Sequence, residues 1–532
     1  MSDENVYLKH NAQVEPLFNQ WYAWSQLIAP ATAAMQIAQS HLKVMQSFVA
    51  NPQIHVSALK NPAMRGGPFI NYDASRVDEI KELARRTAKE GAHMLRLAEA
   101  IKALDELLAK EASGYSLEPL YGKIPADLRG FVELVYDWNN NPSARFIEGL
   151  MYKSPYYDQS SQSVALSLAF DDDRSFAFST PRLRSEDTLF LSVPFADGRL
   201  DELFKMRCVP QPVGDVKEMF PVRREDEQLF ASLFTQERPQ SCPKFTGDGV
   251  RIRYFGHACI LIESKDVSIL CDPVISYKHD NSIFRYTYAD LPARLDYVLI
   301  THNHQDHCML ETLLQLRHKI KTLVVPKNNG GGLADPSLKL MFRNIGFGNV
   351  IEIDEMEEIK IDGVSITGIP FLGEHGDLNI RSKIAYLISL EGKTVMCMAD
   401  SNNIEPMVYQ YVREIVPHVN VLFIGMECDG APMSWVYAPL LTRSLPRKMD
   451  QTRRLDGSNG EKALDIVNRL SPEQVFVYAM GQEPWLTYVT AIQYTEASRP
   501  IIESNKLVEA CRGRGITAER LFGHKDILLA SH

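Results

Sequence analysis

The chain has 532 residues, of which 45% are hydrophobic and 23% are charged, and its 57 basic and 67 acidic side chains give a formal net charge of −10. This composition excludes a collagen-like or wholly disordered chain, and the length fits two or three domains. The acidic balance argues against a nucleic-acid backbone as the main partner, because the binding of phosphates depends on Lys and Arg.

The first ten residues are polar and acidic, and no basic segment leads into an apolar run, so we expect no secretory signal. No stretch approaches the ~20 apolar residues that a membrane-spanning helix needs. The eight cysteines form no Cys-x-x-Cys pair and mostly lie in apolar segments, which favours buried, reduced thiols. We therefore expect a cytoplasmic protein that binds neither membrane nor nucleic acid.

The segment 16–110 is predicted to be helical. Residues 31–49 carry apolar side chains at helical spacing. Ser75 is expected to cap the helix that follows it, and Asp78 stands where a capping box places its acidic residue.

From about residue 163 the pattern changes to strand-like apolar runs, at 164–170 and 188–193. The polar stretch 236–249 holds two prolines and two glycines, a composition typical of a domain boundary. We therefore predict an α+β N-terminal domain over 1–245, without a metal-ligand cluster, and a second domain over 246–532.

The second half is predicted to contain many short strands. They are expected at 250–255, 259–263, 267–271, 297–301, 322–326, 350–353, 364–369, 384–390, 394–398, 421–425 and 474–478. Helices are predicted between the later strands, at 405–416 and 461–470. Strands that first cluster and then alternate with helices indicate a sheet core covered by helices.

The strongest chemical signal follows the predicted strand 297–301. Four metal-competent side chains lie within six positions: His302, His304, Asp306 and His307. Two histidines that are two residues apart project to the same side of an extended segment, and the turn that follows can bring the other two side chains to a neighbouring position. We therefore expect these residues to hold two adjacent metal ions.

This His-x-His-x-Asp-His motif after an apolar strand resembles the signature of the metallo-β-lactamase superfamily. The segments 255–263 and 269–273 resemble the opening hairpin of that superfamily. The resemblance covers about 250–529. It implies an αββα sandwich with a dinuclear metal site at one edge of the two sheets.

The superfamily supplies its remaining ligands after later strands. Asp400 follows the strand 394–398, where the bridging aspartate is expected. Either Glu374 or His375 can take the position of the third histidine. A dinuclear zinc hydrolase would use His375 and a last histidine after the final strand, but the stretch 474–485 contains no histidine.

The choice of Glu374 gives a carboxylate-rich site, which suits iron better than an all-imidazole site does. One metal would be bound by His302, His304 and Glu374, the other by Asp306 and His307, with Asp400 bridging; His375 remains the second choice for Glu374. This pattern, with the segments 21–24 and 65–71 of the long N-terminal half, resembles the diiron β-hydroxylases of nonribosomal peptide pathways.

That resemblance implies a monooxygenase with two iron ions, O2 as co-substrate and an external electron donor. The substrate would be an amino acid tethered as a thioester to a peptidyl carrier domain of a nonribosomal peptide synthetase, hydroxylated at its β-carbon. The N-terminal half would cap the site, dock the carrier and form a homodimer. The alternatives are a dinuclear zinc hydrolase of a thioester, lactone or phosphodiester, and a metal-containing scaffold without turnover.

Other polar residues of the second half are weaker candidates. Glu427 and Asp429 follow a predicted strand, where they would orient a ligand or relay protons as catalytic acids, or simply form a polar turn. Asp272 is expected to form a turn or to support a ligand histidine, and His257 to be structural. A basic cluster is predicted to bind the carrier domain or to form a solvated loop. It consists of Arg443, Arg447, Lys448, Arg453 and Arg454.

Overall fold

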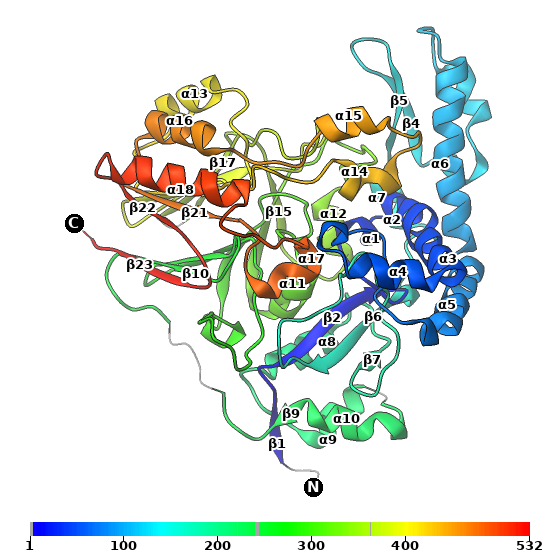
Figure 1. The fold of residues 1–532 in the computed structure, drawn as a ribbon, viewed down its shortest axis with the longest axis horizontal. Helices are drawn as coiled ribbons and strands as arrows, with labels where there is room; N and C mark the ends of the chain where they lie inside the picture. Colours follow the sequence, from blue (N-terminus) through cyan, green and yellow to red (C-terminus); the bar gives the residue numbers. More distant parts are fainter. Residues whose placement is uncertain (1–3, 221, 240–243, 362, 532) are drawn as a thin grey trace.

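A computed structural model describes residues 4–220, 222–239, 244–361 and 363–531. The second half forms two seven-stranded sheets that pack face to face (Figure 1). The first sheet has the order β15-β14-β13-β12-β11-β10-β23 and the second β16-β17-β18-β19-β20-β21-β22. Within each sheet some pairs are parallel, including β12–β13–β14–β15 and β19–β20–β21–β22.

The strands of the two sheets have the following bounds. They are β10 (Val250–Tyr254), β11 (Ile260–Glu263), β12 (Ser268–Cys271), β13 (Leu295–Leu299), β14 (Ile320–Pro326), β15 (Val350–Ile353), β16 (Glu358–Ile361), β17 (Val364–Ile369), β18 (Ala385–Leu390), β19 (Lys393–Cys397), β20 (Val421–Gly425), β21 (Gln474–Tyr478), β22 (Thr517–Arg520) and β23 (Lys525–Leu529). The expected strands are all present to within about two residues at each end. Three short strands had not been predicted: β16, β22 and β23.

Helices cover the outer faces of both sheets. The helices of the second half are α11 (Leu310–Leu316), α12 (Leu338–Asn344), α13 (Met407–Ile415), α14 (Ser434–Tyr437), α15 (Arg447–Thr452), α16 (Gly460–Leu470), α17 (Thr487–Thr490) and α18 (Arg499–Arg512), of which α14, α15 and α17 lie outside these two layers. An apolar cluster lies between the sheets, and another lies between the second sheet and α13, α16 and α18. The predicted αββα sandwich is therefore confirmed.

The first half combines small sheets with helices, as expected of an α+β region. Its strands are β1 (Asn5–Leu8), β2 (Ala12–Phe18), β3 (Trp21–Tyr22), β4 (Val132–Tyr136), β5 (Pro142–Phe146), β6 (Gln162–Leu168), β7 (Leu189–Leu191), β8 (Gln211–Pro212) and β9 (Phe234–Thr235). Its helices are α1 (Ser25–Ile28), α2 (Pro30–Gln36), α3 (Leu42–Ala50), α4 (Pro52–Leu59), α5 (Val77–Glu90), α6 (Ala92–Glu111), α7 (Glu148–Met151), α8 (Gly198–Lys205), α9 (Val213–Met219) and α10 (Glu227–Ser232).

Two local expectations for this half were wrong. The segment 16–110 is not helical throughout, because β2 and β3 occupy its start and pair with each other. Ser75 does not cap α5: Asp73 accepts a hydrogen bond from the backbone N–H of Ser75, and a 3₁₀ turn leads into the helix at Val77.

The two halves share one apolar core rather than standing apart. A single cluster of buried side chains joins Trp21 and Leu27 of the first half to Leu313 and Phe342 of the second. The boundary stretch 236–249 lies partly outside the described residues, so the division at 245/246 stays a prediction.

A buried ion cluster reinforces this contact. Arg174 contacts Glu15 of β2 at 2.6 Å and Glu311 of α11 at 2.8 Å, and Arg182 contacts Glu15 at 2.7 Å. Burial alone would raise the pKa of Glu15, but Arg182 and Arg174 outweigh it and lower that pKa to about 2. Because each charge has an opposite partner, the cluster fixes the first half against the helix that follows the histidine motif.

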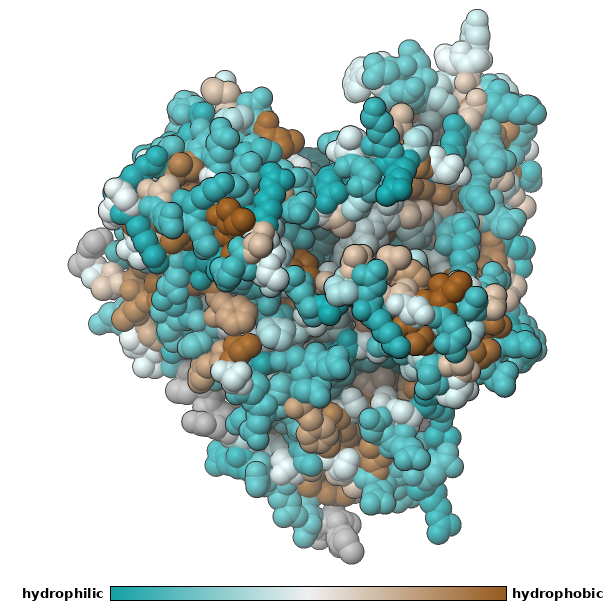
Figure 2. Space-filling model, viewed as in Figure 1, coloured by the Kyte–Doolittle hydropathy of each residue, from teal (hydrophilic) through white to brown (hydrophobic). Residues whose placement is uncertain are grey.

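The surface and the thiols agree with the composition. The face shown in Figure 2 is mostly hydrophilic, and among the helices of the described residues none has the length and apolarity to cross a membrane. Cys242 lies outside the described residues; the other cysteines are free thiols, and all of these except Cys208 are buried.

Candidate metal centre

The candidate ligands come together because each follows the carboxyl end of a strand. His302 and its neighbours follow β13, Glu374 follows β17, and Asp400 follows β19. The strands of the two stacked sheets bring these ends to one edge of the sandwich. The structure thus assembles in one place six residues that are widely separated in the sequence: His302, His304, Asp306, His307, Glu374 and Asp400.

Their donor atoms form overlapping groups. His302, His304 and Glu374 form one group, and Nδ1 of His304 lies 2.8 Å from Oε1 of Glu374. His302, His307 and Asp400 form a second, in which Oδ2 of Asp400 lies 3.6 Å from Nε2 of His302 and 3.0 Å from Nε2 of His307. One oxygen of Asp400 thus lies near both His302 and His307.

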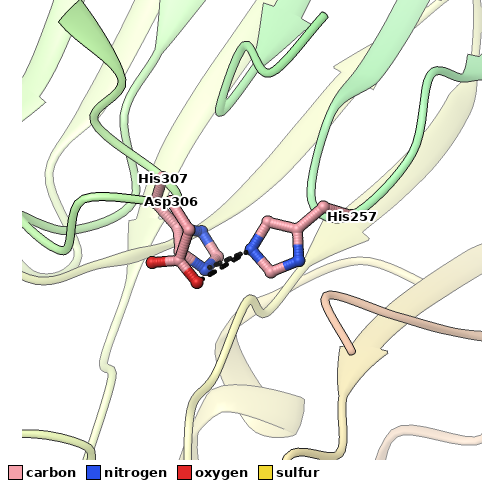
Figure 3. A group of neighbouring side chains, drawn as sticks. All are labelled: His257, Asp306 and His307. Atoms are coloured by element: carbon pink, nitrogen blue, oxygen red, sulfur yellow. Dashed lines mark hydrogen bonds and ion pairs between the residues drawn. The ribbon is translucent and has the colours of Figure 1, made fainter. Parts of the chain in front are cut away.

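A third group contains His257, Asp306 and His307 (Figure 3). Nε2 of His257 lies 3.2 Å from Nε2 of His307 and 3.4 Å from Oδ2 of Asp306. The backbone N–H of Gly481 donates to Nδ1 of His257 at 3.1 Å. Because Nδ1 accepts from Gly481, His257 can carry a proton on Nε2 and donate it to Asp306, which is a supporting role.

Asp272 orients His302 and His307 through the Nδ1 side of their rings. Its Oδ2 accepts hydrogen bonds from Nδ1 of His307 at 2.8 Å and from the hydroxyl of Thr301 at 2.6 Å. The Thr301 hydroxyl oxygen in turn lies 3.0 Å from Nδ1 of His302. With both Nδ1 atoms holding protons, the Nε2 atoms of His302 and His307 are free to bind metal.

Glu374 and His375 have different surroundings. His375 belongs to none of the three groups found among the described residues, and its Nδ1 lies 2.8 Å from the hydroxyl of Tyr437. The same hydroxyl lies 3.0 Å from Nε2 of His304, so Tyr437 orients both rings. Glu374 itself has φ of 70°, a strained conformation for a residue with a side chain and one that is typical of functional sites.

The charges around Glu374 favour a bound cation. Burial raises the pKa of Glu374, and the nearby carboxylates of Asp400 and Asp306 raise it further. Burial lowers the pKa of His302, aided by the neighbouring histidines, and that of His304 falls to about 4, so both are neutral ligands at pH 7. The buried carboxylate of Glu374 is therefore stable as an anion only beside added positive charge.

Unpaired donor atoms point to the same conclusion. Nε2 of His302 and Oδ1 of Asp400 are buried and have no hydrogen-bond partner in the described part of the chain. Buried polar atoms are normally paired, so such atoms indicate a missing ligand. The donor set of oxygen and imidazole nitrogen suits iron, and the residues present fit a dinuclear iron site.

The two predicted catalytic acids have different surroundings. Glu427 follows β20, and burial together with the charges of Asp400 and Glu374 raises its pKa. Asp429 is exposed and lies 3.5 Å from Arg454, so the structure does not bring it to the ligands. In the basic cluster, Arg443 and Arg454 pair with acids and Arg453 donates to the carbonyl of Gly376.

The chain matches known families along most of its length. Residues 7–239 match the family described as the diiron non-heme beta-hydroxylase N-terminal domain, and residues 251–425 match the beta-lactamase superfamily domain. The chain is 39% identical to the 4-amino-L-phenylalanyl-(CmlP peptidyl carrier protein) 3-hydroxylase of Streptomyces venezuelae over 529 residues, 98% of this chain and 99% of that protein. This chain therefore belongs to the family of diiron non-heme β-hydroxylases.

Solved structures agree with this assignment. The crystal structure of CmlA, a diiron β-hydroxylase from Streptomyces venezuelae, superposes with a TM-score of 0.93 at 38% identity, covering 99% of this chain and 100% of that one. A mutant of CmlA in which a glutamate is replaced by aspartate gives a TM-score of 0.90 at 38% identity, over 98% and 100% of the two chains. The similarity thus extends over both halves.

Proposed function

We propose that this chain hydroxylates the β-carbon of an aromatic amino acid held as a thioester on a peptidyl carrier domain. One atom of O2 enters the C–H bond and the other leaves as water, with two electrons from an external reductant and two protons. Bound iron would supply the activation of O2. The relative from Streptomyces venezuelae, which acts on a 4-amino-L-phenylalanyl carrier protein, supports this substrate class.

The observation that carries the proposal is the carboxylate-rich donor set. Glu374, rather than His375, stands with His302 and His304. In the proposed arrangement these three hold one iron, Asp306 and His307 hold the other, and Asp400 bridges. Glu427 remains the candidate for a proton donor beside the site, and the exposed Asp429 is left out.

The residues of this chain shape the site and exclude water from it. The ligands are less than one-tenth exposed, so water has little access to the reacting centre. The thioester-linked substrate would reach it through the cavity described below. An external reductant, a homodimer and a capping role for residues 1–245 remain predictions that follow from the family, and a cytoplasmic location remains a prediction from the sequence.

A metal-content measurement on matched variants tests the ligand set. Glu374→Ala is expected to lose iron, whereas His375→Ala is expected to keep two irons per chain, because His375 is held by Tyr437 and not by the ligand group. Iron lost from the histidine variant and kept in the glutamate variant would contradict the assignment. Stoichiometric zinc without iron in the native protein would favour the hydrolase alternative.

A further inference from the structure

A cavity of about 690 Å³ lies between the first half and the segment that contains α14. Gln305, which stands between His304 and Asp306, lines it, so the cavity reaches the turn that carries the metal ligands. Its size falls in the range of about 300–1,000 Å³ that drug-sized ligands occupy. It therefore has room for an aminoacyl group together with part of the flexible arm that links this group to the carrier domain.

The lining has two chemical characters. Many of the residues are aromatic: Trp21, Tyr22, Trp24, Phe69, Phe176, Phe178 and Trp435. Polar residues come mainly from one stretch, 36–47, which runs from α2 into α3. Along this stretch Lys43 and Ser47 are exposed, whereas His41 is only 4% exposed. The cavity thus opens near Lys43 and Ser47, and His41 lies inside it.

His41 is held in an unusual way. It ends the π-helical turn Ile37–His41, a rare geometry that occurs often at functional sites. Its ring stacks on the buried ring of Trp21, with centroids 4.0 Å apart and planes 4° from parallel. Burial lowers the pKa of His41 to about 3, so the imidazole is neutral at pH 7.

The ring nitrogens of His41 have no hydrogen-bond partner among the described residues. A neutral imidazole offers one N–H donor and one acceptor. A polar group of a ligand in the cavity could therefore form a hydrogen bond with His41.

We propose that His41 determines side-chain specificity by hydrogen bonding to a hydroxyl or amino group on the aromatic ring of the carrier-tethered amino acid. This inference rests on the proposed function and adds a residue to it. The aromatic residues of the cavity would pack against the aromatic ring of the substrate, and the carrier arm would leave through the opening near Lys43 and Ser47. Because His41 is buried whereas Lys43 and Ser47 are exposed, we expect it to meet the substituent of the ring rather than the arm.

The test uses one carrier protein loaded with phenylalanine, tyrosine or 4-aminophenylalanine, and compares hydroxylation rates by intact mass. The wild type is expected to prefer at least one of the substituted rings. His41→Phe keeps a planar ring on Trp21 but removes both nitrogens, and is expected to lower that preference about tenfold or more while the iron content is unchanged. Gln39→Leu, a half-buried cavity residue from the same stretch, is the matched control and should keep the preference.

Several outcomes would overturn the inference. They are equal rates of the wild type on all three substrates, an equal loss on all three in His41→Phe, and an equal loss of preference in Gln39→Leu. If the iron-loaded protein hydroxylates none of the carriers, both the proposed function and this inference are wrong. That result differs from hydroxylation without preference, which overturns the role of His41 alone.

Discussion

The carboxylate of Asp272 holds the ring of His307 through a 2.8 Å contact between Oδ2 and Nδ1, and both residues are fully buried. The same oxygen accepts from Thr301, whose hydroxyl contacts His302. One aspartate therefore sets the proton position on two histidines that would bind different metal ions.

Asp272→Asn should weaken iron binding about 10–100-fold, because a neutral amide is a weaker acceptor for Nδ1 of His307 and for the hydroxyl of Thr301 that contacts His302. Iron affinity is measured by competition with a chelator. The matched control is Asp296→Asn, since Asp296 also accepts from a backbone N–H and a hydroxyl, those of Ser268, on a neighbouring strand. Equal iron affinity of the two variants would show that Asp272 only stabilises the fold.

His257→Phe should weaken the binding of iron at one position and leave iron binding at the other position unchanged. The variant removes the donor that His257 offers to Asp306, which belongs to the position shared with His307. His257→Gln, which keeps an N–H donor, should retain more of the second iron. Iron per chain is measured at rising concentrations of iron; two equally tight irons in His257→Phe would contradict the supporting role of this residue.

Gly425→Ala should displace Asp400. A Cβ atom at Gly425 would lie 2.8 Å from Oδ1 of Asp400 and closer still to the backbone oxygen of Ala399. The variant is expected to lose the dinuclear site but to remain folded. Iron content measures the first outcome and circular dichroism the second. Gly348→Ala is the control, because a Cβ atom at Gly348 would meet no other atom of the described residues within 4 Å; an unchanged iron content in both variants would contradict the proposed bridge.

Glu148 should make stability depend on pH. It accepts hydrogen bonds from Asn328 and from the N–H of Ser337 in the second half, but burial outweighs these and raises its pKa from 4.5 to about 7. The folded state then binds this proton more tightly than the unfolded state, so its contribution is complete below about pH 4.5 and is lost as the pH rises towards 7. The loss is on the order of 3 kcal/mol.

The measurement is denaturant unfolding of the wild type and Glu148→Gln between pH 4.5 and 7.5. The difference in their free energies of unfolding isolates Glu148 from the other titrating groups. That difference should change steadily in favour of the glutamine variant as the pH rises. A constant difference would show that Glu148 titrates normally in the folded protein.

The sequence predicted the parts of the site that are local. His302, His304, Asp306 and His307 lie on one turn, and the apolar runs before them define the strand. Asp400, and Glu374 with His375 as its alternative, were proposed from the resemblance to the superfamily, because each follows a clear strand. The strand β23 was missed because its pairing with β10, rather than a clear pattern of its own, defines it.

Other features depend on tertiary contacts and have no local signal. The donor from Gly481 that fixes the proton on His257 comes from a residue more than two hundred positions away. The cavity is built from several separate segments, so no single pattern indicates it. The strand β2 was hidden because its pairing with β6, rather than its own periodicity, sets its conformation.

The central claim is that oxygen from O2 enters a carrier-bound amino acid. The most direct measurement is the intact mass of an aminoacyl carrier after reaction with iron-loaded, reduced protein under ordinary oxygen and under oxygen-18 gas. The account predicts the gain of one oxygen atom that carries the heavy isotope when the gas does. A carrier that loses its aminoacyl group instead, or a gained oxygen that comes from water, would contradict it.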